Sequence, residues 1–442
     1  MVIGAMVAVA SPAGAAVGDI TELSAGITQP SGVIDVTTGP DGNLWFTEQT
    51  GRRIGRMTPT GTVSEFAIGP SADAEPNEIT TGADGNLWFT EYLGKRVGRI
   101  TPDGVVTEFS EGIHAGASVL GITAGPDGNI WFTESPNSTI GRITPDGVVT
   151  EYSAGISPEA RLVGITAGPD GNLWFTEAFG DRIGRITPQG VVTEFSAGIT
   201  PGAGPSGITT GPDGNLWFTE VNGNRIGRIT PLGVVTELSA GITGAAAPQD
   251  IAAGADGTLW FTERDGNRIG RIATSGVVTE YATGISPASE PWGISAGPDG
   301  NIWFAELDGG RLGRVLTGVV PTSTAAPTVS GSGSVGQELQ VTTGDWSALP
   351  TSYSYQWQRC AATDPTSCGA IAGATSPTYT PVAADLGAVL RAAVTATNLN
   401  GSSIPAVSEP TAVVSLSIPI PPADAGSAPP PAPVPVTPKF TG

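Results

Sequence analysis

Seven glutamates recur at a fixed interval, each at the end of the phrase Leu/Ile-Trp-Phe-Thr/Ala-Glu. Successive members lie 43 residues apart: Glu48, Glu91, Glu134, Glu177, Glu220, Glu263 and Glu306. A carboxylate can bind a hard cation, exchange a proton or pair with a basic side chain. Six of the seven have an arginine five residues further on, whereas Thr139 takes that place after Glu134. We therefore expect most of them to form ion pairs between neighbouring strands.

A second set of polar and aromatic residues occurs in only four of the seven units. In each of these units the residues lie shortly before the repeated phrase that ends in glutamate. The members of the set are Asp35, Glu75, Asn77, Glu78, Asp250, Glu290 and Trp292. Carboxylates beside an exposed indole suit a cation, a sugar or a basic peptide group, so we expect a ligand site here. The alternative, that these segments only plug a channel, stays open.

A metal ion is a further expectation for the same site. Glu91, Glu263 and Glu306 belong to the same group of units and would be its inner ligands. Mg²⁺ or Ca²⁺ suits such a set better than zinc, because the set offers oxygen ligands and neither histidine nor cysteine. The sequence makes no cofactor certain.

The interval of 43 residues indicates a repeat architecture built from short strands. The unit at 164–198 divides into GITAG, NLWFTE, RIGRITP and VVTEFSAG, separated by turns and a short loop. Four such strands make one blade of a β-propeller. The first three strands occur seven times, but the fourth follows only six units, and its seventh copy stands alone at 20–27. We predict an all-β, seven-bladed propeller over 17–316, closed by the N-terminal strand.

Pairing within each blade can also be predicted. If the loop between the second and third strands has four residues, Glu48 lies opposite Arg53. Trp45 then lies opposite Arg56, whose guanidinium can stack on the indole. This loop and the connection between blades share one face, around the mouth of the channel. The connections between blades vary among the units while the strands do not, which is typical of a binding surface.

Composition limits the partners of the protein. The formal net charge is −21 and the isoelectric point about 4.3, so the chain should repel nucleic acid and anionic membranes. Residues 1–16 are apolar and end in small residues, like a secretory signal peptide that lacks its basic start. No other segment reaches the roughly 20 apolar residues of a membrane span. We expect a secreted or cell-surface monomer without membrane insertion.

Three further segments follow the repeats. Residues 317–327 have a linker composition, and 328–415 show alternating short strands whose YQWQRC and ATNLNG segments resemble Ig-like sandwich modules of bacterial secreted proteins. The tail at 416–442 is rich in proline, and we expect it to be disordered. In an oxidising compartment Cys360 and Cys368 should form a disulfide that closes a hairpin.

The repeats resemble the virginiamycin B lyase family. The resemblance rests on the pattern (P/A)DGNLWFTE…RIGRITP…VVTEF and covers 19–316. The resemblance implies a seven-bladed propeller. It also implies the activity of the family's enzymes, which linearise streptogramin B antibiotics by a metal-assisted elimination. Those enzymes use histidines at the start of the first strand of a blade. The corresponding positions, fourteen residues before each repeated glutamate, hold Ile34, Asn77, Leu120, Val163, Ser206, Gln249 and Trp292.

The lack of histidine at these positions argues against the lyase activity that the resemblance implies. His114, the single histidine, falls in a connection between blades and out of that register. A carboxylate could replace histidine as the base only if burial raised its pKa. We therefore expect an extracellular binding or interaction module for a glycan, a peptide or a small molecule. A metal-dependent carbon–oxygen lyase is the alternative, and a purely architectural surface protein is a third hypothesis.

Overall fold

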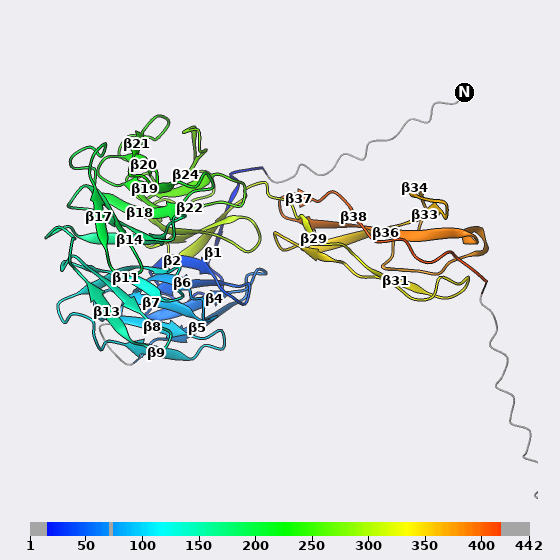
Figure 1. Cartoon of the computed structure of the whole chain (residues 1–442), viewed down its shortest axis with the longest axis horizontal. Helices are drawn as coiled ribbons and strands as arrows, with labels where there is room; N and C mark the ends of the chain where they lie inside the picture. The colour runs from blue at the N-terminus through cyan, green and yellow to red at the C-terminus, as the bar shows by residue number, and fades with distance from the viewer. Residues whose placement is uncertain (1–15, 70–73, 417–442) are drawn as a thin grey trace, which may run out of the picture. The chain divides into compact units, whose positions relative to one another are not determined.

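The regular secondary structure of the described residues is almost entirely β-strand. The computed structural model describes residues 16–69 and 74–416 (Figure 1). The predicted signal-like segment, apart from its last residue, and the predicted tail, apart from its first, lie outside these residues. Within the described ranges, no helix has the length and hydropathy that a membrane crossing requires.

Seven sheets of four antiparallel strands form the blades of the predicted propeller, and in six of them the strands follow chain order. Blade 1 contains β2 (Val33–Thr38), β3 (Leu44–Glu48), β4 (Arg53–Met57) and β5 (Val63–Ala67), and blade 2 contains β6 (Pro76–Thr81), β7 (Leu87–Glu91), β8 (Arg96–Ile100) and β9 (Val106–Phe109). Blade 3 contains β10 (Ser118–Ala124), β11 (Ile130–Ser135), β12 (Thr139–Ile143) and β13 (Val149–Tyr152), and blade 4 contains β14 (Leu162–Ala167), β15 (Leu173–Glu177), β16 (Arg182–Ile186) and β17 (Val192–Phe195). Blade 5 contains β18 (Pro205–Thr210), β19 (Leu216–Glu220), β20 (Arg225–Ile229) and β21 (Val235–Leu238), and blade 6 contains β22 (Pro248–Ala253), β23 (Leu259–Glu263), β24 (Arg268–Ile272) and β25 (Val278–Tyr281).

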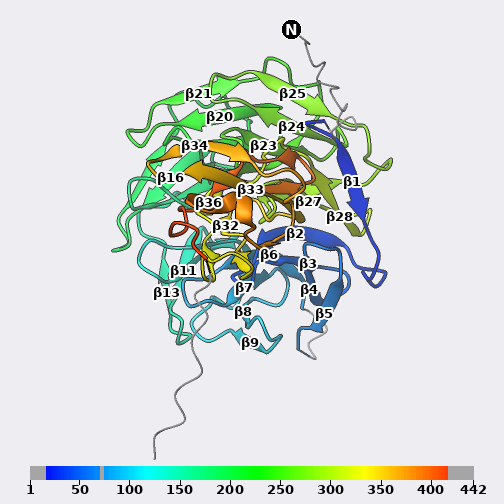
Figure 2. The same ribbon diagram turned by 90° about the vertical axis from the view of Figure 1, so that its right-hand side faces the viewer.

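Blade 7 joins the two ends of the repeat region. It contains β26 (Pro291–Ala296), β27 (Ile302–Glu306) and β28 (Arg311–Val315), and its outer strand is β1 (Ile20–Leu23). Ile20 pairs with Val315, and Figure 2 shows β1 beside β28. The first strands of successive blades pack side by side around the ring, including β26 against β2. The predicted closure is confirmed, and it leaves no blade with a missing strand.

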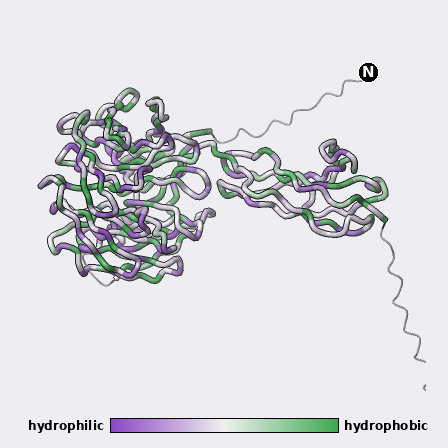
Figure 3. The backbone as a smooth tube through the Cα atoms, in the orientation of Figure 1, coloured by the Kyte–Doolittle hydropathy of each residue, from purple (hydrophilic) through white to green (hydrophobic). Residues whose placement is uncertain are grey.

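The Trp-Phe pair of each unit fills the space between blades. Trp45 is buried against Phe89 of blade 2 and lies opposite Arg56, whose guanidinium is 5.5 Å from the centre of the indole. Phe46 lies over Gly55, where an added Cβ would come within 2.0 Å of the ring, so only glycine fits. The predicted register is confirmed. Figure 3 shows the resulting alternation of hydrophobic strand segments and hydrophilic turns along the propeller.

The C-terminal part of the chain is also all-β. One sheet has the order β34-β33-β36-β37 with β38 beside β36, a second has the order β30-β31-β35, and β29 pairs with β32. The elements are β29 (Ser323–Ala325), β30 (Val329–Ser330), β31 (Leu339–Val341), β32 (Asp345–Trp346), β33 (Ser352–Ala361), β34 (Asp364–Ala370), β35 (Thr378–Tyr379), a 3₁₀ turn (Ala383–Asp385), β36 (Ala388–Asn398), β37 (Gly401–Ser402) and β38 (Ala406–Val407). The Ig-like assignment stays a prediction.

Two details of this region bear on the sequence analysis. Cys360 on β33 faces Cys368 on β34, and the two form the predicted disulfide within a hairpin. Within the predicted linker at 317–327, residues 323–325 form the short strand β29, which pairs with β32.

Candidate functional site

The seven repeated glutamates lie inside the blades. Glu48 is buried at the end of β3, opposite Arg53 on β4, and accepts a hydrogen bond from the guanidinium at 2.7 Å. Glu65 on β5 lies 3.5 Å from the same guanidinium. The corresponding distances between glutamate and arginine in the five other blades that carry this arginine run from 2.8 to 3.9 Å. The expected ion pairs between strands are confirmed.

Burial governs the protonation of these glutamates. Burial raises the pKa of Glu48 to about 7, although the charge of Arg53 opposes the rise. In blade 3, where Thr139 replaces the arginine, burial and the negative charge of Glu151 raise the pKa of Glu134 to about 8. Both carboxyl oxygens of Glu134 lack a hydrogen-bond partner among the described residues. These side chains are framework whose charge state depends on the neighbouring arginine.

The predicted inner metal ligands belong to this framework. Glu91, Glu263 and Glu306 are fully buried, and each lies within 3.9 Å of the arginine of its own blade. They do not line the channel cavity, and across 16–69 and 74–416 no three His, Cys, Asp or Glu side chains are grouped as metal ligands. The placement of these glutamates does not fit the predicted metal site, because each lies outside the cavity beside an arginine whose positive charge would repel a cation. We derive no chemical step through a metal ion.

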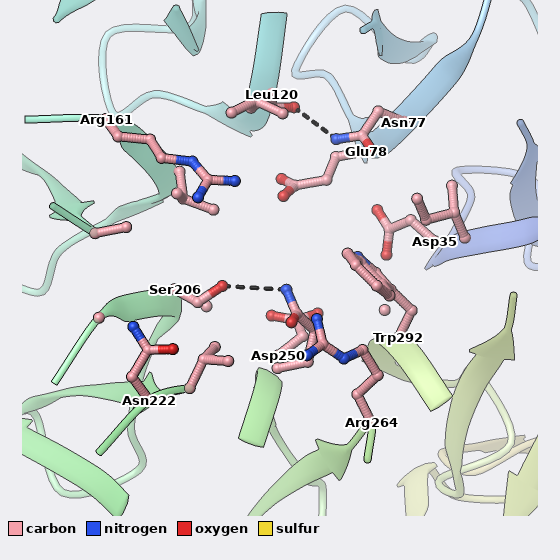
Figure 4. A pocket seen from close by; sticks show the side chains of 18 of the residues that line it. Asp35, Asn77, Glu78, Leu120, Arg161, Ser206, Asn222, Asp250, Arg264 and Trp292 are labelled. Atoms are coloured by element: carbon pink, nitrogen blue, oxygen red, sulfur yellow. Dashed lines mark hydrogen bonds between the residues drawn. The ribbon is translucent and has the colours of Figure 1, made fainter. Parts of the chain in front are cut away.

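A cavity of about 300 Å³ lies at the centre of the ring (Figure 4). The first strand of every blade contributes the residue that the family resemblance marked: Ile34, Asn77, Leu120, Val163, Ser206, Gln249 and Trp292. No imidazole is among them. His114 is exposed in the connection before blade 3, where its Nδ1 lies 2.7 Å from the Asn137 side-chain amide.

A β-bulge in each first strand sets the shape of this cavity. Because the bulge interrupts the strand alternation, the consecutive residues Asn77 and Glu78 both line the cavity. Thr90 holds the bulge: its hydroxyl accepts the Glu78 N–H at 3.1 Å and donates to the Leu120 carbonyl of the next blade at 2.7 Å. Six blades have this threonine bridge, and blade 7 has Ala305 instead.

The second bulge position carries the acids of the cavity. Asp35, Glu78 and Asp250 occupy it in blades 1, 2 and 6, whereas the other four blades have glycine. Each acid accepts a backbone N–H from the first strand of the following blade at 2.9 to 3.1 Å, and the donors are Ile79, Ile122 and Ile294. At Gly121 an added Cβ would lie 2.3 Å from the Val163 carbonyl oxygen, so that position has no room for a side chain. The acidity of the cavity is therefore confined to three blades.

The three carboxyl groups hold their protons more tightly than free ones. Burial, followed by the negative charge of Asp250, raises the pKa of Asp35 well above its usual range. Burial and the charges of Asp35 and Asp250 do the same to the pKa of Glu78. Burial raises the pKa of Asp250 to about 6. A bound cation would relieve this repulsion and favour the ionised forms.

Two arginines line the cavity: Arg161 lies opposite Asp35, whereas Arg264 lies beside Asp250 and Trp292. Arg161 stacks over Phe179 at 5.0 Å from the ring centre, and Arg264 stacks over Trp292 at 5.7 Å. Figure 4 shows the guanidinium of Arg161 pointing into the cavity from the side opposite Asp35. Arg264 also pairs with Asp265 at 2.8 Å. The guanidinium of Arg161 makes no hydrogen bond or ion pair with any described residue, so it is available to a ligand.

Five of the seven predicted ligand residues meet in this cavity, namely Asp35, Asn77, Glu78, Asp250 and Trp292. Glu75 and Glu290 do not line it. Glu75 lies two residues before Asn77, and Glu290 lies two residues before Trp292. Their backbone carbonyls accept hydrogen bonds from the N–H groups of Tyr92 and Leu307, in the loop after the second strand of the same blade.

The sequence analysis missed Arg161, Phe179 and Arg264. The first occupies the same repeat position as Glu75 and Glu290, and the other two lie in the loops between second and third strands. These positions vary between units, and that variation was the available signal.

Comparison with known proteins agrees with this architecture. The model of the virginiamycin B lyase family matches residues 14–198 and 120–328. The chain belongs to the virginiamycin B lyase family. Two solved structures support the assignment: a streptogramin B lyase at 36% identity and a TM-score of 0.63, and the virginiamycin B lyase of Staphylococcus aureus at 40% identity and a TM-score of 0.62. Each match covers 67% of this chain, and 97% and 98% of the respective relative.

A further structure of the S. aureus enzyme is also similar. It is a catalytically inactive histidine-to-alanine variant crystallised with quinupristin, 39% identical to this chain with a TM-score of 0.63, and the match covers 67% of this chain and 99% of the variant. No match was found among curated proteins. Similarity to more distant solved structures, such as an extracellular domain of a Bacteroides thetaiotaomicron sensor at 12% identity and a TM-score of 0.55, shows the fold alone.

Proposed function

We propose that this member of the virginiamycin B lyase family is an extracellular binding module whose ligand occupies the central cavity. The observation that carries the proposal is the make-up of the cavity wall. Seven equivalent positions, one per blade, converge there, and none supplies an imidazole. The wall offers three carboxylates, an indole and an arginine without a partner, which are groups for recognition.

The extracellular location rests on the disulfide and the composition. Cys360 and Cys368 are bonded, and structural disulfides persist in oxidising compartments. The N-terminal segment predicted as a signal peptide agrees with export. The charge of −21 disfavours nucleic acid as a partner and leaves a glycan, a peptide or a small molecule.

An elimination without histidine is the second candidate, and one observation favours it. The pKa of Asp250, about 6 because of burial, suits a general base near neutral pH. Asp250 lines the cavity. One of the solved structures similar to this chain is named a streptogramin B lyase. In this alternative Asp250 would remove a proton from a substrate bound beside Trp292.

One experiment separates the two candidates. The protein is mixed with quinupristin and with panels of glycans, peptides and small molecules, while mass spectrometry follows ring opening of quinupristin and tryptophan fluorescence follows binding. The Trp292→Phe variant shows which part of the fluorescence signal comes from the cavity. Saturable binding that needs Trp292, without ring opening, is the expected result. Ring opening that Asp250→Asn abolishes would establish the lyase instead, and no binding by any ligand would refute the binding module.

A further inference from the structure

The cavity carries carboxyl groups on one side and the guanidinium of Arg161 on the other, and these opposite charges restrict the chemical class of the ligand. Figure 4 shows the carboxylate of Glu78 and the guanidinium of Arg161 turned toward each other across the opening. The gap is too wide for a direct contact, because Arg161 forms no ion pair with any described carboxylate. Both groups line the same cavity, so a small ligand can touch both.

The acidic side of the cavity suits an ammonium group. Backbone N–H groups of the next blade hold one oxygen each of Asp35 and Glu78, and these bonds fix the carboxylates in place. The second oxygen of Glu78 makes no hydrogen bond to a described residue, whereas Asp35 also accepts the backbone N–H of Val36. Burial, and after it the repulsion among Asp35, Glu78 and Asp250, raises the pKa of Asp35 and of Glu78. A positive charge placed between these side chains would offset both effects and favour their ionised forms.

The opposite side suits a carboxylate. A guanidinium presents a planar fork of N–H donors that matches a carboxylate, and stacking on Phe179 leaves the donors of Arg161 free. A ligand that carried only a positive charge would leave this arginine unpaired and close to a like charge. A neutral sugar would leave both charged sides without a counter-charge.

A mixed groove with aromatic walls continues from the side of Arg161. A second cavity of about 570 Å³ shares Leu120, Arg161 and Phe179 with the first, and it adds Tyr92 and Pro136 together with the polar residues Ser118, Ser135 and Glu159. The side chains of Phe179 and Tyr92 are 70% and 37% exposed, which leaves their rings open to a ligand. Aromatic rings of this kind hold apolar or aromatic side chains.

We propose that the cavity binds a short peptide in zwitterionic form with an aromatic C-terminal residue. Its ammonium group lies among Asp35, Glu78 and Asp250, its carboxylate pairs with Arg161, and its aromatic side chain lies in the groove beside Phe179. This inference rests on the proposed binding function, and it names the class of ligand.

The test measures affinity by calorimetry for the peptides Gly-Phe and Ala-Ala-Phe and for their N-acetylated and C-amidated forms. At least one zwitterionic peptide should bind. Acetylation and amidation should each weaken its binding about tenfold or more, because each removes one charge-assisted contact. If neither peptide binds, or if a blocked form binds as well as the free one, the ligand class is wrong. The binding module itself would still stand if a glycan or another small molecule bound through Trp292.

Two matched variants assign the ends of the peptide. Glu78→Gln keeps an acceptor for the Ile122 N–H, so it should fold normally. It should reduce the effect of acetylation and leave the effect of amidation unchanged, because Asp35 and Asp250 still face the ammonium group. Arg161→Gln should abolish the effect of amidation alone. If both variants weaken the free and the blocked peptides equally, the assigned orientation is refuted. Circular dichroism and the melting temperature check that each variant is folded.

Discussion

Blade 3 allows a test of how the buried glutamates are held. Here Thr139 replaces the arginine, and Asn137 stands where blade 1 has Gly51. A Cβ on Gly51 would lie 2.7 Å from the Arg53 guanidinium nitrogen, so an arginine at position 139 needs glycine at 137. The perturbation is therefore the double substitution Asn137→Gly and Thr139→Arg, with each single substitution as a control.

The expected gain follows from the pKa values of equivalent glutamates. Burial raises the pKa of Glu134 to about 8. Among the glutamates that face an arginine, the pKa is about 7 in blades 1, 2 and 4 and about 8 in blades 5, 6 and 7, so a well-placed arginine lowers the pKa by at most about one. A difference of one in pKa corresponds to about 1.4 kcal/mol. Since ordering the new arginine costs side-chain entropy, we expect a net stabilisation of about 1 kcal/mol in the double variant.

The sign of the pH dependence is part of this prediction. The new arginine favours the ionised form of Glu134, so its stabilisation is complete above pH 8, where that glutamate is ionised in both proteins. The gain is lost as the pH falls below 7, where Glu134 is protonated in both.

Chemical denaturation at pH 6 and pH 9 measures the difference in the free energy of unfolding. Thr139→Arg alone should not stabilise, because Asn137 occupies the space that the guanidinium needs. Adding Glu134→Gln to the double variant should remove the pH dependence. Equal gains at both pH values, or a gain from the single Thr139→Arg variant, would refute the reasoning.

Three further predictions address the framework and the C-terminal part. Ala305→Thr should supply the threonine hydrogen bonds between blades that only blade 7 lacks, and it should raise the free energy of unfolding by about 1 kcal/mol. A melting temperature equal to or below that of the parent would contradict this expectation. The melting temperature should fall between about pH 5 and pH 8, because burial raises the pKa of the repeated glutamates, Glu48 among them, to about 7 or 8, so their ionisation destabilises the fold. A melting temperature that rises over this range would refute this expectation. Replacing Cys360 and Cys368 by serine should destabilise the C-terminal part by about 2–3 kcal/mol in thermal denaturation, while an equal effect of dithiothreitol on the variant and the parent would argue against the disulfide.

The fold could be predicted because the same local constraints occur seven times. Trp45, Phe46 and Gly55 can pack in only one register, since Phe46 lies over a residue without a side chain. The fourth strand that stands alone at the N-terminus then has one place left, beside β28. Repetition made each of these inferences testable within the sequence itself.

The site could be predicted only in part, because its chemistry lies at positions that differ between units. The prediction recognised Asp35, Glu78 and Asp250 as exceptions to the repeat, and these acids do line the cavity. The regular alternation of a strand gives no reason for two consecutive residues to face the cavity, and the bulge that brings them there is not visible in the sequence. The prediction also had no means of placing Arg161, which reaches the cavity from a different repeat position than the acids.

The bulge explains how one framework can carry different chemistry in its centre. In five blades the first strand offers the cavity two consecutive positions. The threonine bridge, present in six blades, holds the bulge whatever the side chains are, since it binds only backbone groups. The first position takes residues as different as Ile34, Gln249 and Trp292, and the second takes an acid or glycine. Substitutions at these positions therefore change the charge and shape of the cavity without loss of the bridges between blades. In this chain that freedom has produced a cavity with carboxylates on one side and an arginine on the other.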